Sequence, residues 1–411
     1  MGKILQPPVI TGYGAITALG ENCHVASRNM AEGLICNVSM GERFFPNGFF
    51  APCFQVSSVA PDVGRSKLDD LLSTTKINNR TVLLTLLAVA EGLHRAGLSL
   101  DDIRKKRVGI ALGTTVGCTF HNEEYYIKWR DDRNPAPEPL LAYLGSTLAD
   151  KVKEILGVMG PSLVITNACA SGTDAIGVAK TWLGNNVCDI AIAGGADELS
   201  RVACHGFKSL MLYSETSCTP FDANRQGLNL GEGAGILVME KLTDAEKRSQ
   251  EILGKVRGYG IAGDAYHPTA PHPEGRGLQC AIHGALQDSG LIVDDICLIN
   301  AHGTGTPAND LAETNAISAA GFAPDRLAVV STKGFTGHTL GAAGGVEAVY
   351  TLMALNLGRV FGTGGCHQID PKLNFPVLSE SDRQVLSGKV GMSQSLAFGG
   401  SNSALVLEGV K

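Results

Sequence analysis

The sequence lacks several features that would assign the protein to a class at once. No apolar stretch in its 411 residues reaches the length of a membrane span, and Met1 to Gln6 leave no room for a signal peptide before the first predicted strand. The 11 cysteines include no Cys-x-x-Cys pair, which disfavours a disulfide framework and a metal site built from paired ligands. We therefore expect a cytoplasmic protein with free thiols and no membrane contact.

Positive charge is also scarce. The 34 Lys and Arg residues are outnumbered by 40 Asp and Glu residues, and the formal net charge is −6. A general nucleic-acid surface needs the opposite balance, so we expect no nucleic-acid partner. The 44% of hydrophobic residues and the 51 glycines instead fit a compact α/β protein with many tight turns between strands and helices.

A third absence concerns nucleotide binding. The segment from Val9 to Thr17 is predicted to be a strand that runs into a glycine-rich turn, with Gly12 and Gly14 in the first two positions of a Gly-x-Gly-x-x-Gly pattern. Thr17 stands where the third glycine belongs, so the dinucleotide-binding fingerprint is incomplete. We therefore expect no dinucleotide cofactor.

Predicted strands and helices alternate along the chain, and the second half repeats the order of the first. Strands that end in small residues are predicted at 108–115 and 296–301, and strands that end in Gly-Gly at 189–195 and 390–400. A charged helical segment at 241–250 separates the halves. This alternation predicts an α/β fold of parallel sheets covered by helices on both faces, with domains at 1–250 and 251–411.

One cysteine occupies a favourable place for chemistry. The stretch from Val164 to Gly172 begins as an apolar, β-branched run, places Cys169 between two alanines, and leads into an apolar pattern of helical period. Cys169 is therefore predicted to lie at the turn from a buried strand into a helix N-terminus. Unpaired N–H groups and the helix dipole lower a thiol pKa toward neutrality there, which suits a nucleophile. A small buried cysteine without chemistry is the alternative.

Two histidines stand at similar junctions in the second half. His302 follows the strand 296–301 in Ala-His-Gly-Thr-Gly-Thr, and His338 precedes a predicted helix in Gly-His-Thr-Leu-Gly-Ala. Equivalent strand ends of two related halves converge, so we expect Cys169, His302 and His338 to meet. A zinc site is the alternative for such a trio, but the sequence offers neither closely spaced ligand pairs nor an evident fourth ligand.

The segments around these three residues together resemble the β-ketoacyl-acyl carrier protein synthases. The matching stretches are Asn167 to Gly172, Gly227 to Gly235, Ala301 to Thr306, Lys333 to Gly344 and Phe398 to Asn402. They keep the family's order and cover essentially the whole chain. The resemblance implies a thiolase fold, in which two similar halves form a five-layer αβαβα sandwich, and it implies a dimer.

Three details favour the elongating enzymes within this superfamily. Degradative thiolases carry a second reactive cysteine near the C-terminus, whereas the last cysteine of this chain is Cys366. Initiating synthases have an asparagine where His338 stands, and a chain-length factor lacks the nucleophilic cysteine. The intact Cys-His-His set therefore resembles an elongating condensing enzyme, and it argues against an inactive scaffold that only binds carrier protein.

The resemblance also implies the chemistry of the site. Cys169 would carry the acyl chain, and the N–H groups of Cys169 and Phe398 would bind the oxyanion. His302 and His338 would donate to the enolate oxygen that forms when malonyl-carrier protein loses CO2. Phe398 would also gate the path of the acyl chain.

Further residues would support this chemistry by the same resemblance. Lys333 and Glu347 would orient the histidines, with Glu313 as a partner of Lys333. Thr304 and Thr306 would bind the phosphopantetheine arm of acyl carrier protein, and no tightly bound cofactor is expected. Some relatives hold a structural cation at positions that match Asn300, Glu347, Ser393 and Asn402.

One departure from the family pattern bears on the pathway. Fatty-acid synthases of this kind usually read Gly-Phe-Val-Leu-Gly where this chain has Gly-Leu-Asn-Leu-Gly at 227–231, and the segment 207–220 is shorter than theirs. We expect a ketosynthase for a polyketide or polyene chain, paired with a chain-length-factor-like paralogue. A homodimeric fatty-acid elongating synthase is the alternative, and acyl carrier protein is the expected partner in both cases.

Overall fold

The computed structural model describes residues 6–36, 38–40, 44–45, 50–57, 77, 79–115 and 122–411. Ten of its strands form one mixed sheet in the order β10-β9-β13-β14-β8-β1-β7-β6-β4-β5. The strands of the first half are β1 (Val9–Thr17), β4 (Val108–Gly113), β5 (Ser162–Ile165), β6 (Ile190–Asp197) and β7 (Gly233–Glu240). The strands of the second half are β8 (Gly254–Gly263), β9 (Leu298–Asn300), β10 (Ala328–Val330), β13 (Val390–Ala397) and β14 (Ser401–Glu408).

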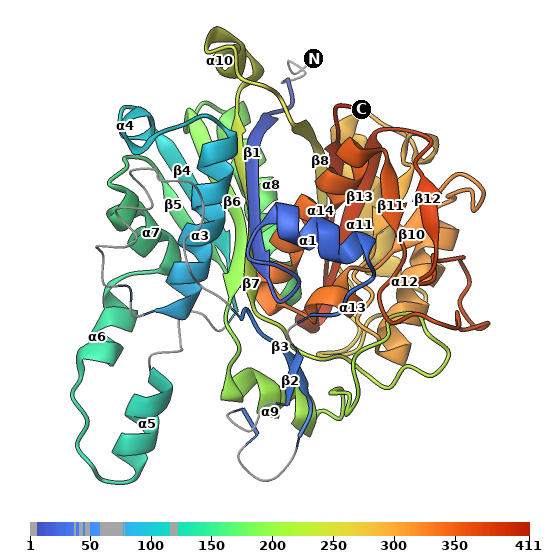
Figure 1. Ribbon diagram of the computed structural model, residues 1–411, viewed down its shortest axis with the longest axis horizontal. Helices are drawn as coiled ribbons and strands as arrows, with labels where there is room; N and C mark the ends of the chain where they lie inside the picture. Colours follow the sequence, from blue (N-terminus) through green and yellow to red (C-terminus); the bar gives the residue numbers. More distant parts are fainter. Residues whose placement is uncertain are drawn as a thin grey trace.

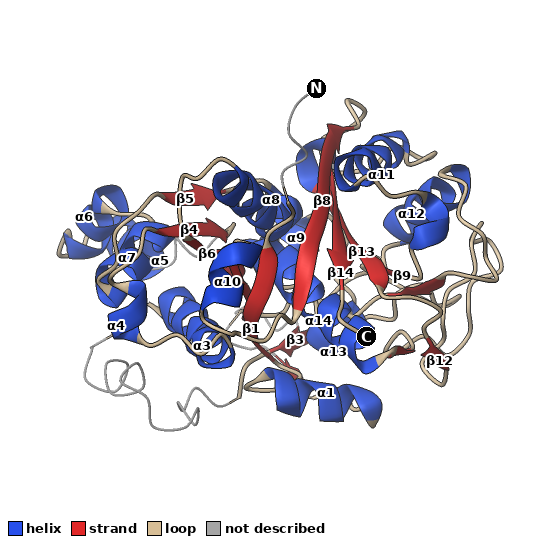
Figure 2. Ribbon diagram, turned by 90° about the horizontal axis from the view of Figure 1, so that it is seen from above, coloured by secondary structure: helices blue, strands red, loops and turns tan. Residues whose placement is uncertain are grey.

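The two halves of this sheet have the same topology. β4 runs parallel to β5 and β6, as β9 runs parallel to β10 and β13, while the remaining pairs within each half are antiparallel. β1 and β8 join the halves side by side at the centre (Figure 2), where Val9 pairs with Lys255 and Ile10 with Gly254. The predicted repeat is therefore confirmed.

The prediction of wholly parallel sheets is wrong. A parallel neighbour requires a long crossover, whereas a short turn returns the chain antiparallel. β13 and β14 are joined only by the short 3-10 turn η4 (Phe398–Gly400), and each strand residue from Val390 to Ala397 has an antiparallel partner in β14. The equivalent strand of the first half, β7, is likewise antiparallel to both of its neighbours, β6 and β1.

Helices cover the sheet halves and also separate them. α3 (Arg80–Arg95) and α7 (Leu148–Leu156) pack on the first half, and α11 (Arg276–Ser289) packs on the second with α12 (Pro307–Ala319) beside it. α8 (Ser171–Gly184) and α14 (Ala343–Leu357) contact each other and strands of both halves. The result is the expected five-layer α/β sandwich of the thiolase fold (Figure 1).

Shorter elements complete the chain. The additional helices are α1 (Cys23–Ala31), α4 (Leu100–Ile103), α5 (Asn122–Arg130), α6 (Glu138–Gly145), α9 (Arg201–Ser209), α10 (Leu242–Lys247) and α13 (Lys333–Thr336). Two-stranded sheets are formed by β2 (Val38–Met40) with β3 (Pro52–Phe54) and by β11 (Arg359–Phe361) with β12 (Arg383–Val385). α5 and α6 form a helical hairpin that projects from the body at the lower left of Figure 1.

The central helix explains one hydropathy signal. The prediction that no apolar stretch reaches the length of a membrane span is wrong for the segment Leu340–Leu357, which contains α14. This segment is apolar and long enough by composition, and 83% of it is buried inside the protein. A helix that is apolar on all sides belongs in a core when other elements surround it. Its hydrophobicity is thus accounted for by its place between the two sheet halves.

Two glycines of β1 have a packing role. A Cβ atom at Gly12 would lie 1.9 Å from the carbonyl oxygen of Gly92, and one at Gly14 would lie 2.2 Å from that of Ala88. Both carbonyls belong to α3, so the glycines permit close approach of this helix to the strand. The predicted glycine-rich turn is wrong, because β1 continues as a strand to Thr17.

The strand before Cys169 differs from its prediction as well. β5 is the outermost strand of the first half rather than a buried one, and Leu163 is 41% exposed. Its apolar residues therefore lie on a strand that has no further neighbour among the described residues, and natural proteins normally cover or pair such an edge.

Candidate active site

The turn that presents Cys169 is tightly braced. β5 ends at Ile165, Ala168 adopts a left-handed φ of 44°, and Cys169 lies in the 3-10 turn η1 (Ala168–Ala170) directly before α8. The Ser171 hydroxyl accepts from Asn167 N at 2.8 Å and donates to Ala168 O at 2.6 Å. A non-glycine residue in this backbone region is strained, and such strain collects at functional sites.

Strand β14 of the second half also supports the turn that carries Cys169. Asn167 Nδ2 donates to Asp174 Oδ2 at 2.6 Å and to Ser401 Oγ at 2.8 Å, and Ser403 Oγ donates to Asp174 Oδ1 at 2.5 Å. Ser401 and Ser403 belong to β14. The cysteine turn is therefore held against the strand that follows Phe398.

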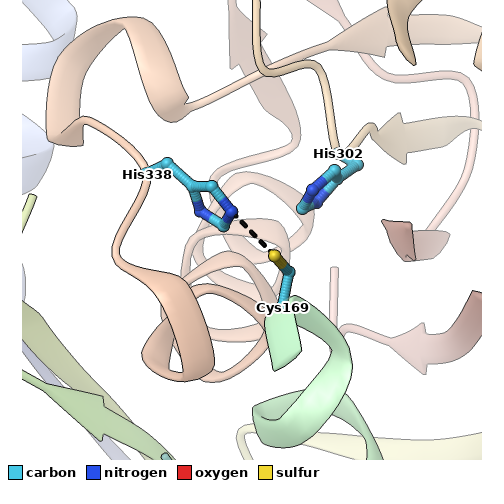
Figure 3. Close-up of side chains that lie close together, drawn as sticks. All are labelled: Cys169, His302 and His338. Atoms are coloured by element: carbon cyan, nitrogen blue, oxygen red, sulfur yellow. Dashed lines mark hydrogen bonds between the residues drawn. The ribbon is translucent and has the colours of Figure 1, made fainter. Parts of the chain in front are cut away.

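The structure brings the three expected residues together. Cys169 Sγ lies 3.0 Å from His338 Nε2, and the sulfur and one nitrogen of each histidine all lie within 4.8 Å of one another. The rings of His302 and His338 are 5.1 Å apart and nearly perpendicular. Figure 3 shows both imidazoles facing the sulfur, which points up from the start of α8. All three side chains are buried.

The protonation of Cys169 differs from the prediction. Burial raises the pKa of the Cys169 thiol to about 11, against the opposing effects of the Lys333 charge and the backbone N–H groups of Phe398 and Cys169. The helix N-terminus was expected to lower this pKa, but it lies in the interior, where loss of water disfavours the thiolate more than the N–H groups stabilise it. Cys169 therefore rests as a thiol at neutral pH.

Lys333 fixes the orientation of His302. Its ammonium group donates to His302 Nδ1 at 3.1 Å, to the carbonyl oxygen of His302 at 2.6 Å, and to Glu347 in a short contact. An ammonium group has no lone pair, so Nδ1 must accept, and neutral His302 carries its proton on Nε2. Burial and the Lys333 charge hold the pKa of His302 well below its usual range.

The acidic partners of this cluster are arranged differently from the prediction. Glu347 pairs with Lys333, and burial raises the pKa of Glu347 to about 7 against the effect of that lysine. Glu313 was expected to partner Lys333, but its two oxygens accept from His302 N at 2.6 Å and from Gly303 N at 2.8 Å. Glu313 thus holds the backbone of the His302 turn.

His338 has the same tautomer for a different reason. Leu340 N donates to His338 Nδ1 at 3.3 Å, so the imidazole proton lies on Nε2, the atom nearest to the sulfur. Burial, reinforced by Lys333, holds the pKa of His338 well below its usual range. The site therefore contains two neutral imidazoles, each with an N–H group directed at the space beside Cys169.

These tautomers bear on the zinc alternative. A metal ion on Nε2 would displace the proton there, and metal-bound imidazoles normally donate through their other nitrogen. Here Nδ1 of His302 and of His338 each accepts a hydrogen bond instead. The trio is therefore built to donate hydrogen bonds rather than to ligate a metal.

Three of the four positions matched to a structural cation offer suitable atoms. Asn300 Oδ1, Glu347 Oε2 and Ser393 Oγ are buried and have no hydrogen-bond partner among the described residues. Buried oxygens of this kind suit a hard cation. Asn402 does not share this feature, and its Nδ2 donates to Asp264 Oδ1 at 3.0 Å and to Gly400 O at 3.1 Å.

A cavity of about 340 Å³ opens onto the three residues. Thr304 and Thr306 line it, and their hydroxyl oxygens are 2.9 Å apart. Phe398 lines it as well, and its ring lies 5.2 Å from that of Phe207 on α9. Phe207 was not predicted as a site residue, because only the tertiary fold brings α9 to the cavity.

Fold and site together define a condensing enzyme of the thiolase fold. The chain matches the family described as Beta-ketoacyl synthase, N-terminal domain over residues 6–245, and the family described as Beta-ketoacyl synthase, C-terminal domain over residues 253–366. It belongs to the β-ketoacyl synthase family, whose members are condensing acyltransferases.

Known relatives extend over the whole chain. The 3-oxoacyl-[acyl-carrier-protein] synthase 2 of Staphylococcus aureus (strain N315) is 32% identical over 411 residues, which cover 97% of each chain. The enzyme of the same name from Synechocystis sp. is 33% identical over 412 residues, again with 97% of each chain covered.

Solved structures share the fold at full length. A chain of the ketosynthase ApeO in complex with its chain length factor ApeC from Xenorhabdus doucetiae has a TM-score of 0.82 and 28% identity, with 100% of both chains covered. A chain of the ishigamide ketosynthase/chain length factor has a TM-score of 0.87 and 29% identity, over 99% of this chain and 100% of that one.

Proposed function

We propose that the protein is a β-ketoacyl-acyl carrier protein synthase that elongates an acyl chain held on Cys169 by decarboxylative condensation with malonyl-carrier protein. The observation that carries this proposal is the meeting of one buried thiol with two neutral imidazoles whose N–H groups both face it. A thiol supplies the acyl carrier, and two N–H donors supply what an enolate oxygen needs.

Acylation is the first step. The sulfur of Cys169 attacks the acyl thioester, and the oxyanion forms beside the N–H groups of Cys169 and Phe398, both of which act on the sulfur in the resting site. The pantetheine thiol leaves with a proton as the acyl chain transfers to Cys169. One well-aligned oxyanion donor contributes about 3 kcal/mol to such a step.

Decarboxylation and condensation follow. The bond between the malonyl carboxylate and the α-carbon breaks, CO2 leaves, and the electron pair forms an enolate whose oxygen accepts from Nε2 of His302 and His338. The α-carbon then attacks the acyl carbon and expels the Cys169 sulfur, which gives a β-ketoacyl chain on the carrier protein. Lys333 orients His302 and fixes the tautomer of that histidine, and Glu347 holds Lys333 in place.

The cavity suits a substrate carried on phosphopantetheine. The hydroxyls of Thr304 and Thr306 line it and can bind the amides of the arm. Phe398 packs against Phe207 beside the sulfur, where a turn of the ring would admit an acyl chain. We expect no tightly bound cofactor, and acyl carrier protein as the partner that delivers both substrates.

We further propose a soluble cytoplasmic enzyme that works as a dimer. The dimer is supported by the edge at β5, the last strand of the sheet among the described residues, where Leu163 is 41% exposed and Met159, just before the strand, is 72% exposed. The division into domains at 1–250 and 251–411 is supported by α10, which connects β7 to β8 in the region where one half of the sheet gives way to the other.

The pathway we favour is a polyketide or polyene one, with a chain-length-factor-like paralogue as the second subunit. The structural relatives from Xenorhabdus doucetiae and the ishigamide system, both described with a chain length factor, support this choice. The second candidate is a homodimeric fatty-acid elongating synthase, which the Staphylococcus and Synechocystis relatives support. An inactive carrier-binding scaffold is disfavoured by the intact trio.

The test is incubation of the protein with malonyl-carrier protein and acyl-carrier proteins of several chain lengths, followed by mass spectrometry. We expect an acyl adduct on Cys169 and a β-ketoacyl product, both lost in Cys169→Ala. Cys169→Gln should still decarboxylate malonyl-carrier protein, because both histidines are unchanged. An undiminished product with Cys169→Ala would refute the mechanism.

A second measurement separates the two candidates. Native mass spectrometry of the purified chain, alone and with a co-expressed cysteine-lacking paralogue, reports its assembly. A heterodimer with condensing activity that the chain alone lacks is expected for the polyketide or polyene enzyme. A fully active homodimer would instead favour the fatty-acid synthase.

A further inference from the structure

The loop that carries His302, Thr304 and Thr306 is held from behind by two buried acids of α12. Glu313 accepts from the backbone of His302 and Gly303, as described above. One turn earlier, Asp310 Oδ1 accepts from Gly305 N at 3.2 Å, directly between the two threonines. The path of the loop through the cavity therefore depends on carboxylates that have no contact with solvent.

A second segment closes over the same loop. Phe221 has a left-handed φ of 66°, and its N–H group donates to Asp310 Oδ2 at 2.8 Å. A Cβ atom at Gly305 would lie 2.8 Å from the carbonyl oxygen of Gly227, and one at Gly303 would lie 2.9 Å from the Phe221 ring. The loop is thus pressed between α12 and the turn at 219–227.

Among the described residues, Arg225 of that turn is the one cation within ion-pair distance of Asp310. Its Nε lies 3.1 Å from Asp310 Oδ2, and its Nη1 donates to Asp370 Oδ2 and to the carbonyl oxygen of Asp222. The side chains of Arg225 and Asp310 are 5% and 0% exposed. A carboxylate buried to this degree needs a cation nearby to stay ionised.

We propose that Arg225 is a positioning residue for substrate binding, which acts through Asp310 on the loop that carries Thr304 and Thr306. This inference rests on the proposed function, because it assigns the loop to the phosphopantetheine arm.

The physical consequence of losing Arg225 follows from the hydrogen bonds of Asp310. An ionised Asp310 accepts from both Gly305 and Phe221, whereas a protonated carboxyl must turn one oxygen into a donor, which cannot face an N–H group. Without the guanidinium, one of these two bonds is lost. The threonine hydroxyls then shift, while Cys169 and its turn, which Arg225 does not contact, stay in place.

The experiment compares Arg225→Met with the wild-type enzyme in full condensation assays. We expect the KM for malonyl-carrier protein to rise about tenfold or more, because a shift of about 1 Å in binding groups is costly. The rate of alkylation of Cys169 by iodoacetamide should change less than twofold. Arg225→Lys keeps a positive charge beside Asp310 and should restore most of the wild-type KM.

A double-mutant cycle tests the route of the effect. If Arg225 acts through Asp310, adding Arg225→Met to Asp310→Asn should change the KM by less than about twofold, because the two effects are not independent. Arg248→Met is the matched control, since Arg248 pairs with Glu240 away from the cavity. It should leave the KM for malonyl-carrier protein unchanged.

Three outcomes would overturn the inference. These are an unchanged KM in a folded Arg225→Met enzyme, a full additional effect in the Asp310→Asn background, and an equal rise in KM for Arg248→Met. Failure of the proposed function is a different result, because the wild-type enzyme would then form no condensation product at all.

Discussion

The resting state of the nucleophile can be tested directly by its reaction with iodoacetamide as a function of pH. Burial raises the pKa of the Cys169 thiol to about 11, and only the thiolate is alkylated. The alternative is that the N-terminus of α8 and His338 hold a thiolate at neutral pH. The two possibilities predict pH profiles of different shape.

The fraction of Cys169 present as thiolate, and with it the alkylation rate, follows from the difference between the pH and the pKa of the thiol. With a pKa of about 11, about 3 in 10,000 Cys169 side chains are thiolate at pH 7.5, whereas an ordinary cysteine with a pKa of about 8.5 has about 1 in 10. Alkylation of Cys169 at pH 7.5 should therefore be slower by a factor of about 300. Its rate should rise about tenfold for each unit of pH up to about pH 10.

The assay follows modification of each cysteine by peptide mass spectrometry between pH 7 and pH 10. Cys280 on α11 is exposed and gives an internal reference for a thiol outside the site. Saturating acyl-carrier protein should protect Cys169 and leave Cys280 unchanged. A rate at Cys169 that reaches a plateau below pH 9 would show that the thiolate is stabilised in the resting enzyme, and would refute the reasoning from burial.

Three further predictions concern residues around the site and the sheet edge. Lys333→Met removes the donor to His302 Nδ1 and a positive charge that lowers the pKa of Cys169. The rate of condensation should fall about 100-fold or more, and alkylation of Cys169 at pH 9 should slow. An unchanged alkylation rate would contradict this prediction. Asn229→Val leaves Cys218 N and Ser214 O without their buried partner and should lower the free energy of unfolding by about 2 kcal/mol in urea denaturation, whereas no loss would show that these groups find other partners. Leu163→Lys places a charge on the open edge of β5 and should shift the protein toward monomer in size-exclusion chromatography; an unchanged dimer would exclude this edge from the interface.

The sequence predicts the site well because its geometry is a consequence of strand order. Cys169 follows β5, His302 follows β9, and His338 lies between β10 and α14. Parallel strands place their carboxyl ends on one edge of a sheet, so the turns that follow them converge once the two halves have the same order. Only local patterns and the repeat are needed to reach this result.

Other properties depend on packing that no local pattern contains. The pKa of Cys169 is set by how much water the surrounding layers exclude, and not by the helix start that the sequence reveals. The exposure of Leu163 depends on β5 being last in the sheet order. Gly12 was assigned to a turn, because a glycine that admits a neighbouring helix reads in sequence like a glycine that permits a turn.

The repeat also explains how each half stabilises the active residue of the other. β6 and β13 are equivalent strands. Each contacts a 3-10 turn of the opposite half: β6 contacts the turn Leu340–Ala342, and β13 contacts η1. Asp197, the last residue of β6, accepts from Gly341 N at 2.7 Å and so holds the turn after His338. At the end of β13, the N–H group of Phe398 reaches the sulfur of Cys169.

Equivalent turns of the two halves have different roles in the site. In the first half, the turn after β4 holds Thr114, which donates to Asp197 at 2.6 Å, whereas the equivalent turn after β9 holds His302. The turn after β4 therefore supports Asp197, whereas the turn after β9 supplies an active-site histidine. Either half alone would present a thiol without donors or imidazoles without a nucleophile, so the chemistry requires both halves with their sheets in register.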